Sequence, residues 1–352
     1  MRQTKACVLS SAWCIFLAAC AVTASPSPTP APLDPTEFLA TRVPQIMTES
    51  AATLTRAPTT TASSPPLPSK TPTGTPVPTK TPTLTPTPYP TIVLANFPTP
   101  PASFEGEAHF HLGRPLGEGG NVFVASSYRY GSTARHRFET HHGVEFPNSA
   151  GAPLVAVAPG VVYFAGNDLT QAFGPQKDFY GNLVVLELAQ SWKDHKVYAL
   201  YGHMDQVLVQ VGQPVNAGDL LGTVGATGVA LGPHLHLEVR LDKPESYWDT
   251  RNPELWLRPL EKTGAVAVRV TNAGGQYLPD MRVGFICADG AYRYLDTYWD
   301  FGVNPDDAYG ENAAMTDVPE GFCHFETVFE GKPLEQTATV TAGEVTFVWL
   351  KP

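Results

Sequence analysis

Short apolar runs, each ended by Gly, Pro or Asn, follow one another along this chain from Pro153 onward. Runs of this length at regular spacing are typical of antiparallel β-strands, and few long stretches show the repeat of an amphipathic helix. We therefore predict an all-β, antiparallel core. The predicted strands are 154–158, 161–165, 183–188, 197–201, 207–211 and 234–241.

After Pro259 the pattern changes to longer stretches of alternating apolar and polar residues. Residues 265–271, 282–286 and 337–348 alternate as strands do, and 318–323 predict a turn into another strand. We expect a small β-sandwich over residues 261–352. This segment resembles prealbumin-like and carboxypeptidase-regulatory β-sandwiches. We expect no catalytic site in it.

A proline-rich tract precedes the predicted strands. Of the 35 prolines in the chain, 20 lie between Pro26 and Pro101. The tract has too few apolar side chains to offset the entropy of ordering. Residues 20–102 are therefore predicted to be a disordered Pro/Thr/Ser-rich tether, largely polyproline II, which at ~3.1 Å per residue reaches on the order of 200 Å when stretched. A passive spacer or a glycosylated stalk is the alternative.

The N-terminus carries an export signal. Arg2 and Lys5 precede an apolar run that ends at Ala19, too short to span a bilayer but suited to a signal peptide. The ending Leu-Ala-Ala-Cys20 resembles the lipobox of bacterial lipoproteins. The resemblance implies a signal peptide over 1–19, a lipid on Cys20 and a place on the outer face of the cytoplasmic membrane or in the cell envelope. Ordinary signal-peptide cleavage is the alternative.

The cysteines agree with export. Cys7 and Cys14 would leave with the signal and Cys20 would carry lipid, so Cys287 and Cys323 remain. An even number in an oxidising compartment predicts that these two pair, with two buried thiols as the alternative.

Net charge excludes one class of partner. The formal charge is −10, and residues 1–103 hold six Lys or Arg and three Asp or Glu, so the remainder has 17 basic and 30 acidic groups. Clustered Lys and Arg are needed to bind nucleic acid, so we expect no nucleic-acid partner.

Residues 103–140 lead into the predicted core. We interpret them as opening strands and a glycine-rich turn at 117–120, which is not a phosphate loop because no Gly-Lys-Ser/Thr follows. His109, His111 and His136 could line a groove, but solvent-facing loop histidines are the commoner outcome.

Five side chains at three places form a candidate metal site with catalytic bases. They are His141 and Glu145, His203, and His234 with His236. Imidazole and carboxylate hold zinc while leaving a position open for water. On a strand, His234 and His236 face the same side, and so do His141 and Glu145 if that stretch is extended. Each alone could be an ordinary surface or core residue.

The sequence around these residues resembles the lysostaphin-type, or LytM-like, zinc endopeptidases of bacterial cell walls. The matching motifs occur in order over about a hundred residues, from Gly143 to Arg240. They include His-His-Gly-Val-Glu145, Tyr180-Gly-Asn, Tyr201-Gly-His203, Gly218-Asp-Leu-Leu-Gly222, Gly225-Ala-Thr-Gly228 and Gly232-Pro-His-Leu-His-Leu-Glu-Val-Arg240. The resemblance implies the duplicated-hybrid-motif β fold over 103–260, with the loop 167–179 as a groove wall that could gate substrate.

The resemblance also implies a ligand set and a reaction. Zn²⁺ would be held by His141, Glu145 and His236, with His203 and His234 as catalytic groups, and which of the two is the general base stays open. The substrates implied are peptidoglycan peptides, cleaved in the stem or cross-bridge. A non-catalytic member that binds wall or activates an amidase is the alternative.

One position departs from the family pattern, which has Asp where this chain has Glu145. We expect Glu145 to be a working ligand in a slightly reshaped site. The alternative is a surface or ion-paired Glu beside a weakened or empty metal position.

Overall fold

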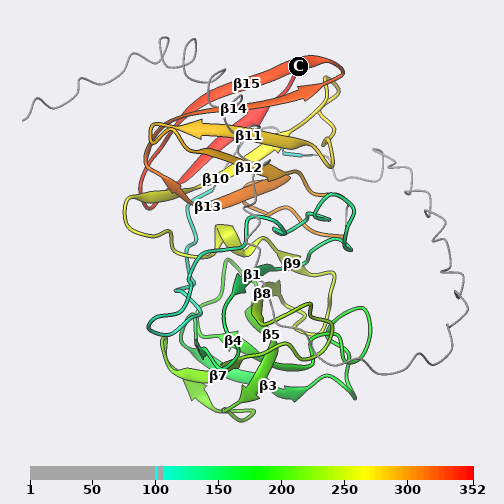
Figure 1. Ribbon diagram of the computed structural model, residues 1–352, viewed down its shortest axis with the longest axis vertical. Coiled ribbons are helices and arrows are strands. Elements are labelled where there is room, and N and C mark those ends of the chain that lie inside the picture. The colour runs from blue at the N-terminus through cyan, green and yellow to red at the C-terminus, as the bar shows by residue number, and fades with distance from the viewer. Residues whose placement is uncertain (1–99, 102–105, 301) are drawn as a thin grey trace, which may run out of the picture.

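The computed structural model describes residues 100–101, 106–300 and 302–352. Its described part is nearly all β, as predicted, and is built from three sheets (Figure 1). The proposed signal peptide, Cys20 and nearly all of the tether lie outside the described residues. Among the helices of the described part, none is long and apolar enough to cross a membrane.

The first sheet has nine strands in the order β1-β8-β5-β4-β3-β6, with β7 joining β2 to β5 and β9 pairing with β8. The strands are β1 (Val144–Pro147), β2 (Pro153–Val155), β3 (Gly160–Asn167), β4 (Asn182–Leu188), β5 (Val197–Val207), β6 (Pro214–Val215), β7 (Leu220–Val224), β8 (His234–Leu241) and β9 (Thr250–Arg251). A short 3-10 turn, η3 (Pro253–Leu255), follows.

Strand β8 places the candidate site at the β1 end of this sheet. It lies between β1 and β5, and all eight of its residues are buried. Its pairing sets Glu145 of β1 opposite His236, and His236 opposite Gly202 of β5. Three segments far apart in sequence therefore meet in one row across the sheet.

Two smaller sheets form the C-terminal part. One has the order β13-β10-β16 and the other β12-β11-β14-β15, and they enclose a core that includes Val268, Phe285 and Phe325. The pairing of β10 with β16 is parallel, whereas the other pairings are antiparallel. The strands are β10 (Thr263–Val270), β11 (Arg282–Cys287), β12 (Tyr292–Asp296), β13 (Ala313–Pro319), β14 (Gly321–Phe329), β15 (Lys332–Val340) and β16 (Val345–Leu350).

Cys287 and Cys323 form a disulfide, which confirms that prediction. They face one another across β11 and β14, so the bond joins the two central strands of the four-stranded sheet. The resemblance of residues 261–352 to particular sandwich families stays a prediction.

The apolar core continues from the nine-stranded sheet into the C-terminal part. One buried cluster contains Leu237 of β8, Trp256 after η3 and Ala267 of β10. The N-terminal segment is also tied to both parts: Leu112 bridges to Leu257, and the carbonyl of Pro101 accepts a hydrogen bond from the Arg269 guanidinium of β10 at 2.7 Å.

Several predicted elements are wrong in detail. Residues 208–211 are not a strand, because β5 ends at Val207 and its chain turns there toward β6. Residues 106–140 form turns and isolated bridges rather than opening strands. The run 337–348 is two strands, because Gly343 takes a positive φ of 74° in the turn between β15 and β16.

Candidate metal centre

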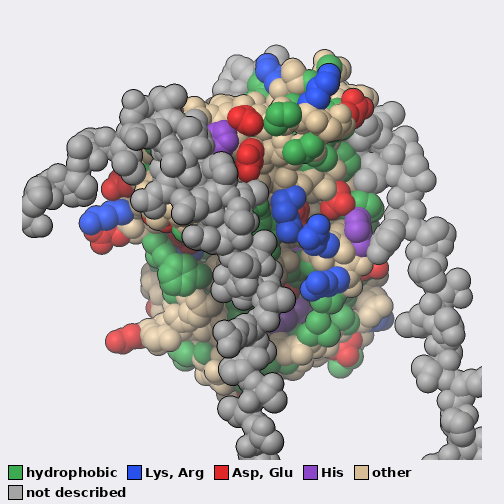
Figure 2. Space-filling view, turned by 45° about the horizontal axis from the view of Figure 1, so that its top comes forward, with side chains coloured by type: hydrophobic (Ala, Val, Ile, Leu, Met, Phe, Trp, Pro, Cys, Tyr) green, Lys and Arg blue, Asp and Glu red, His purple; other side chains and the backbone are tan. Residues whose placement is uncertain are grey.

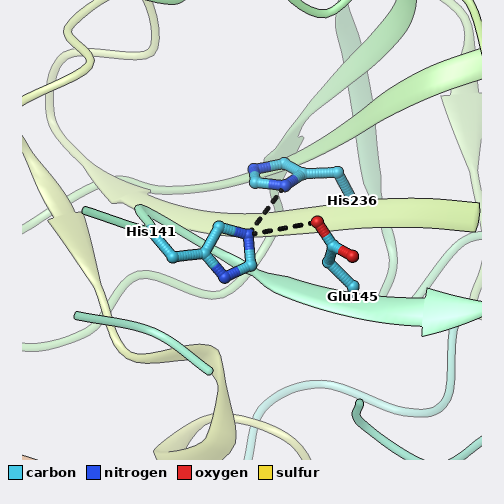
Figure 3. Close-up of side chains that lie close together, drawn as sticks. All are labelled: His141, Glu145 and His236. Carbon is cyan, nitrogen blue, oxygen red and sulfur yellow. Dashed lines mark hydrogen bonds and ion pairs between the residues drawn. The ribbon is translucent and has the colours of Figure 1, made fainter. Parts of the chain in front are cut away.

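Three side chains converge at the β1–β8 end of the nine-stranded sheet (Figure 3). Nε2 of His141 lies 3.2 Å from Nδ1 of His236 and 3.7 Å from a carboxylate oxygen of Glu145. The three candidate ligand atoms all lie within 4.8 Å of one another. The two imidazoles are buried, while the Glu145 side chain is 22% exposed, so the cluster is open to solvent on the carboxylate side.

The outer nitrogen of each imidazole is held by an acceptor. Nδ1 of His141 lies 2.9 Å from the carbonyl of Tyr128, whose ring stacks on the imidazole at 4.0 Å. Nε2 of His236 lies 3.0 Å from Glu238. Since a carbonyl and a carboxylate can only accept, both outer nitrogens carry the proton. The inner nitrogens, Nε2 of His141 and Nδ1 of His236, are left with lone pairs that face each other.

Glu238 belongs to a buried polar network beneath the cluster. Its other oxygen accepts from Nε of Arg240 at 2.6 Å, while the Tyr180 hydroxyl donates to the oxygen that contacts His236. Arg240 in turn donates to the carbonyl of Phe173, in the loop 167–179 that we expected to form a wall. The network fixes the orientation of His236 and anchors that loop. Gating by the loop stays a prediction.

His203 and His234 lie beside the three side chains. Their rings are 4.9 Å apart between centroids, and the His203 ring is 5.7 Å from that of His236. Nδ1 of His203 lies 2.8 Å from the carbonyl of Thr227, and Nδ1 of His234 lies 2.8 Å from that of Gly232. In both rings Nε2 is therefore the nitrogen left to face the site.

Backbone geometry aims two of these groups. His203 has a positive φ of 61°, a strained conformation for a residue with a side chain, at an irregularity of β5 between Gly202 and Met204. Its backbone N–H donates to the Tyr180 carbonyl at 2.8 Å, which holds that conformation. Gly143 allows close packing, because a Cβ there would lie 2.7 Å from Nε2 of His236.

Burial keeps the imidazoles of His141 and His203 neutral. Burial, followed by the neighbouring His236, lowers the pKa of His141 to about 3. Burial, with His236 and His234 nearby, lowers the pKa of His203 to about 3. Burial raises the pKa of Glu145, but the contact with His234 and the nearby His141 lower it by more, to about 2. At neutral pH the cluster thus presents lone pairs and a carboxylate.

These residues fit a divalent metal ion. In their neutral forms the two imidazoles turn lone pairs toward each other at 3.2 Å, an arrangement that a cation between them would stabilise. Nε2 of His234 is buried without a hydrogen-bond partner among the described residues, 3.4 Å from Glu145. Two imidazoles and a carboxylate with an open side are the donor set of a catalytic zinc site.

The three histidines of the segment before the cluster contact residues outside the candidate site. His109 is buried and lies 3.0 Å from Asp306, so it neither lines a groove nor faces solvent as expected. His136 lies 3.0 Å from Asp280 and edge-on to Trp299. His111 is half-buried and lies 3.2 Å from the Gln190 amide.

Sequence reasoning missed the residues that hold the outer imidazole nitrogens. Glu238 could have been found, because it lies two residues beyond His236 on a strand and so shares its side of the sheet. Tyr128 contributes a backbone carbonyl from a segment with no strand pattern. Nothing in its side-chain type could have indicated that role.

Comparisons with known proteins place this part of the chain. Residues 139–247 match peptidase family M23. The DD-carboxypeptidase/endopeptidase Mpg of Neisseria meningitidis serogroup B is 34% identical over 107 residues, which are 30% of this chain and 21% of that protein. The peptidoglycan DD-endopeptidase ShyB of Vibrio cholerae is 33% identical over 103 residues, 29% of this chain and 21% of that protein. The matches thus span about a fifth of these relatives.

A solved structure is also similar. The catalytic domain of the prophage-encoded M23 protein EnpA from Enterococcus faecalis is 25% identical, with a TM-score of 0.33, covering 40% of this chain and 95% of that one. The family match coincides with the ordered motifs and with the strands that carry the five side chains. Residues 139–247 therefore match peptidase family M23, in agreement with the resemblance that the sequence motifs indicated.

Proposed function

We propose that this protein is an exported zinc metalloendopeptidase that hydrolyses peptide bonds in peptidoglycan stem peptides or cross-bridges. The observation that carries the proposal is the convergence of His141, Glu145 and His236, with His203 and His234 beside them. Membership of residues 139–247 in a peptidase family supports hydrolysis of peptide bonds. The name of one relative, the peptidoglycan DD-endopeptidase ShyB, supports the wall as substrate.

Zinc would be held by Nε2 of His141, Nδ1 of His236 and the carboxylate of Glu145. A zinc ion there supplies a Lewis acid that lowers the pKa of a water and polarises a carbonyl. The protein's part is to fix the donors: Tyr128 and Glu238 hold the outer imidazole nitrogens, which sets the tautomer and aims each lone pair.

His203 and His234 would move protons and bind the developing oxyanion. Each is fixed through Nδ1 by a backbone carbonyl, so each presents Nε2 to the reacting peptide. A neutral imidazole accepts a proton from the attacking water, and a protonated one donates a hydrogen bond to the oxyanion.

The alternative, a member that only binds wall or activates an amidase, is disfavoured by the same cluster. A binding module has no use for five groups that all face one solvent-accessible place. Glu145 supplies the carboxylate in the position where the family pattern has Asp, so the departure leaves the donor set complete.

Four variants separate ligation from proton transfer. We expect His141→Ala and His236→Ala to lose both zinc and activity, and His203→Ala and His234→Ala to retain zinc but lose hydrolysis. Zinc content would be measured beside digestion of purified peptidoglycan, with product masses to identify the bond. His195→Ala is the matched control, since this partly exposed histidine pairs with Asp242 away from the site. Intact wall after treatment with zinc-loaded protein would favour the non-catalytic alternative.

We further propose that the protein is anchored to the membrane through a lipid on Cys20, which the Leu-Ala-Ala-Cys20 sequence supports. Each buried methylene of the lipid adds ~0.8 kcal/mol to membrane binding. The protein should sediment with membranes, and Cys20→Ser should release it and change its electrophoretic mobility. Unchanged fractionation and mobility in this variant would contradict the anchor.

A further inference from the structure

A second cluster of metal-binding side chain types lies on the four-stranded sheet, far along the chain from the M23 domain. His324 and Glu326 are two residues apart on β14 and therefore point to the same face. Glu335 of β15 stands directly opposite Glu326 in the strand register. The fold thus brings one imidazole and two carboxylates together on one face of a hairpin.

The imidazole in this cluster is buried and has no hydrogen bond in the described part of the chain. His324 is 7% exposed, and its Nδ1 has no partner among the described residues. Ile286 and Thr337 flank it on the neighbouring strands, which explains the burial. Nε2 lies 3.9 Å from an oxygen of Glu326 and 3.9 Å from one of Glu335, too far for a hydrogen bond.

The two carboxylates also lack a cation. Like charges directly opposite one another across a strand pair destabilise the sheet. Among the described residues, the ion-pair partner of both Glu326 and Glu335 is His324, and no Lys or Arg pairs with either. The side chains are 32% and 53% exposed, so they can rotate and are reachable from solvent.

We propose that His324, Glu326 and Glu335 form a second divalent-cation site, suited to Zn²⁺. Zinc bonds to imidazole nitrogen and carboxylate oxygen measure about 2.0–2.2 Å, so an ion fits between atoms 3.9 Å apart. In the first cluster, Nε2 of His141 lies at similar distances from Nδ1 of His236 and a carboxylate oxygen of Glu145, 3.2 and 3.7 Å. The ion neutralises the facing carboxylates, uses the Nε2 lone pair and joins β14 to β15.

This site differs from the first in having no further histidine to move protons in its cluster. We therefore assign it to binding and to cross-linking of the hairpin, and not to hydrolysis. The inference does not depend on the proposed peptidase activity.

Zinc stoichiometry of the full chain, purified without an affinity tag, tests the proposal. After removal of metal by a chelator and titration with Zn²⁺, the unchanged protein should bind two ions. The variant His141→Ala/His236→Ala should bind one. Adding Glu326→Gln and Glu335→Gln to that variant should abolish the remaining binding or weaken it by about tenfold or more. Glu330→Gln, an exposed position in the same hairpin turn, is the matched control and should change nothing.

Thermal unfolding shows whether the Glu→Gln variants lose zinc because the site is gone or because they fail to fold. In chelator, the Glu326→Gln/Glu335→Gln protein should be at least as stable as the unchanged protein, because the facing charges are gone. Added zinc should raise the melting temperature of His141→Ala/His236→Ala but not that of the variant with all four changes. No bound ion in His141→Ala/His236→Ala, or full zinc binding after both Glu→Gln changes, would overturn the second site. Loss of peptidase activity alone would leave it standing.

Discussion

At the scale of single residues, the position of each imidazole proton determines what the centre can bind. His141 uses Nε2 and His236 uses Nδ1 toward the same point, because Tyr128 and Glu238 occupy the opposite nitrogens. The sequence predicted the five convergent groups from residue type, strand alternation and family motifs. It could not predict which nitrogen faces inward, because that depends on a backbone carbonyl and a buried network that only the folded chain brings close.

Variants of Glu145 test the one departure from the family pattern. Glu145→Gln should lose zinc and hydrolysis, because an amide is a far weaker ligand than a carboxylate. Glu145→Asp should bind zinc less well here, because its arm is one methylene shorter and a displacement of ~1 Å can cost about a hundredfold in rate. Zinc content and peptidoglycan digestion of both variants give the answer. Full occupancy and activity in Glu145→Gln would show that the carboxylate is not a ligand.

Glu238 should matter without touching the metal. Glu238→Gln removes the charge that orients His236 and pairs with Arg240, so zinc affinity should fall by about 10- to 100-fold. Competition with a chromophoric chelator measures the affinity. Glu187→Gln is the control and should leave zinc affinity unchanged, because Glu187 pairs with Lys196 and accepts from the Tyr198 hydroxyl and contacts none of the site residues.

At the scale of elements, strands with a continuous apolar run were predicted well. Strands whose position depends on pairing with a neighbouring strand were not. Runs 183–188 and 234–241 match β4 and β8 closely, since burial on both faces makes them recognisable in isolation. Strand β7 (Leu220–Val224) was missed because it contains Gly222, which is unfavourable in strands. Gly222 leaves room for the Gln206 carbonyl of the paired strand β5, and this close approach cannot be seen in the sequence. Run 207–211 failed because β5 ends at Val207 and the chain continues irregularly, with Val209 buried and Leu208 and Val211 exposed.

The disulfide between β11 and β14 should stabilise the C-terminal sheets. It closes a loop with a sequence separation of 36 residues, so the Cys287→Ser/Cys323→Ser protein should lose roughly 3 to 4 kcal/mol of unfolding free energy. Urea unfolding followed by fluorescence measures this. Equal midpoints with and without the disulfide would show that the hydrogen bonds and packing of the pair suffice.

At the scale of the whole molecule, a buried acidic group joins the parts and makes stability depend on pH. Burial, together with the nearby Asp306 carboxylate, raises the pKa of Glu311 to about 8 from 4.5. Asp306 contacts His109 of the N-terminal segment, while the Tyr298 hydroxyl donates to Glu311. The folded protein keeps a proton here that the unfolded chain releases above pH 4.5.

The contribution of Glu311 to stability is therefore complete below pH 4.5 and is lost as pH rises toward and through 8. The melting temperature should fall between pH 6 and 9, and Glu311→Gln should flatten that fall because it has no proton to lose. Glu320→Gln, at an exposed turn, should leave the slope as it is. An equal slope in the Glu311→Gln protein would assign the pH dependence to other groups.

The Pro101 carbonyl bound by Arg269 gives the molecule a mechanical consequence. Arg269 sits on β10, the middle strand of the sheet β13-β10-β16, and it also holds the carbonyls of Tyr309 and Gly310. A pull on the chain before Pro101 is therefore taken up first by this C-terminal sheet. The nine-stranded sheet follows this contact along the chain, so we expect a pull transmitted through Arg269 to load the C-terminal sheet before it reaches the candidate metal centre.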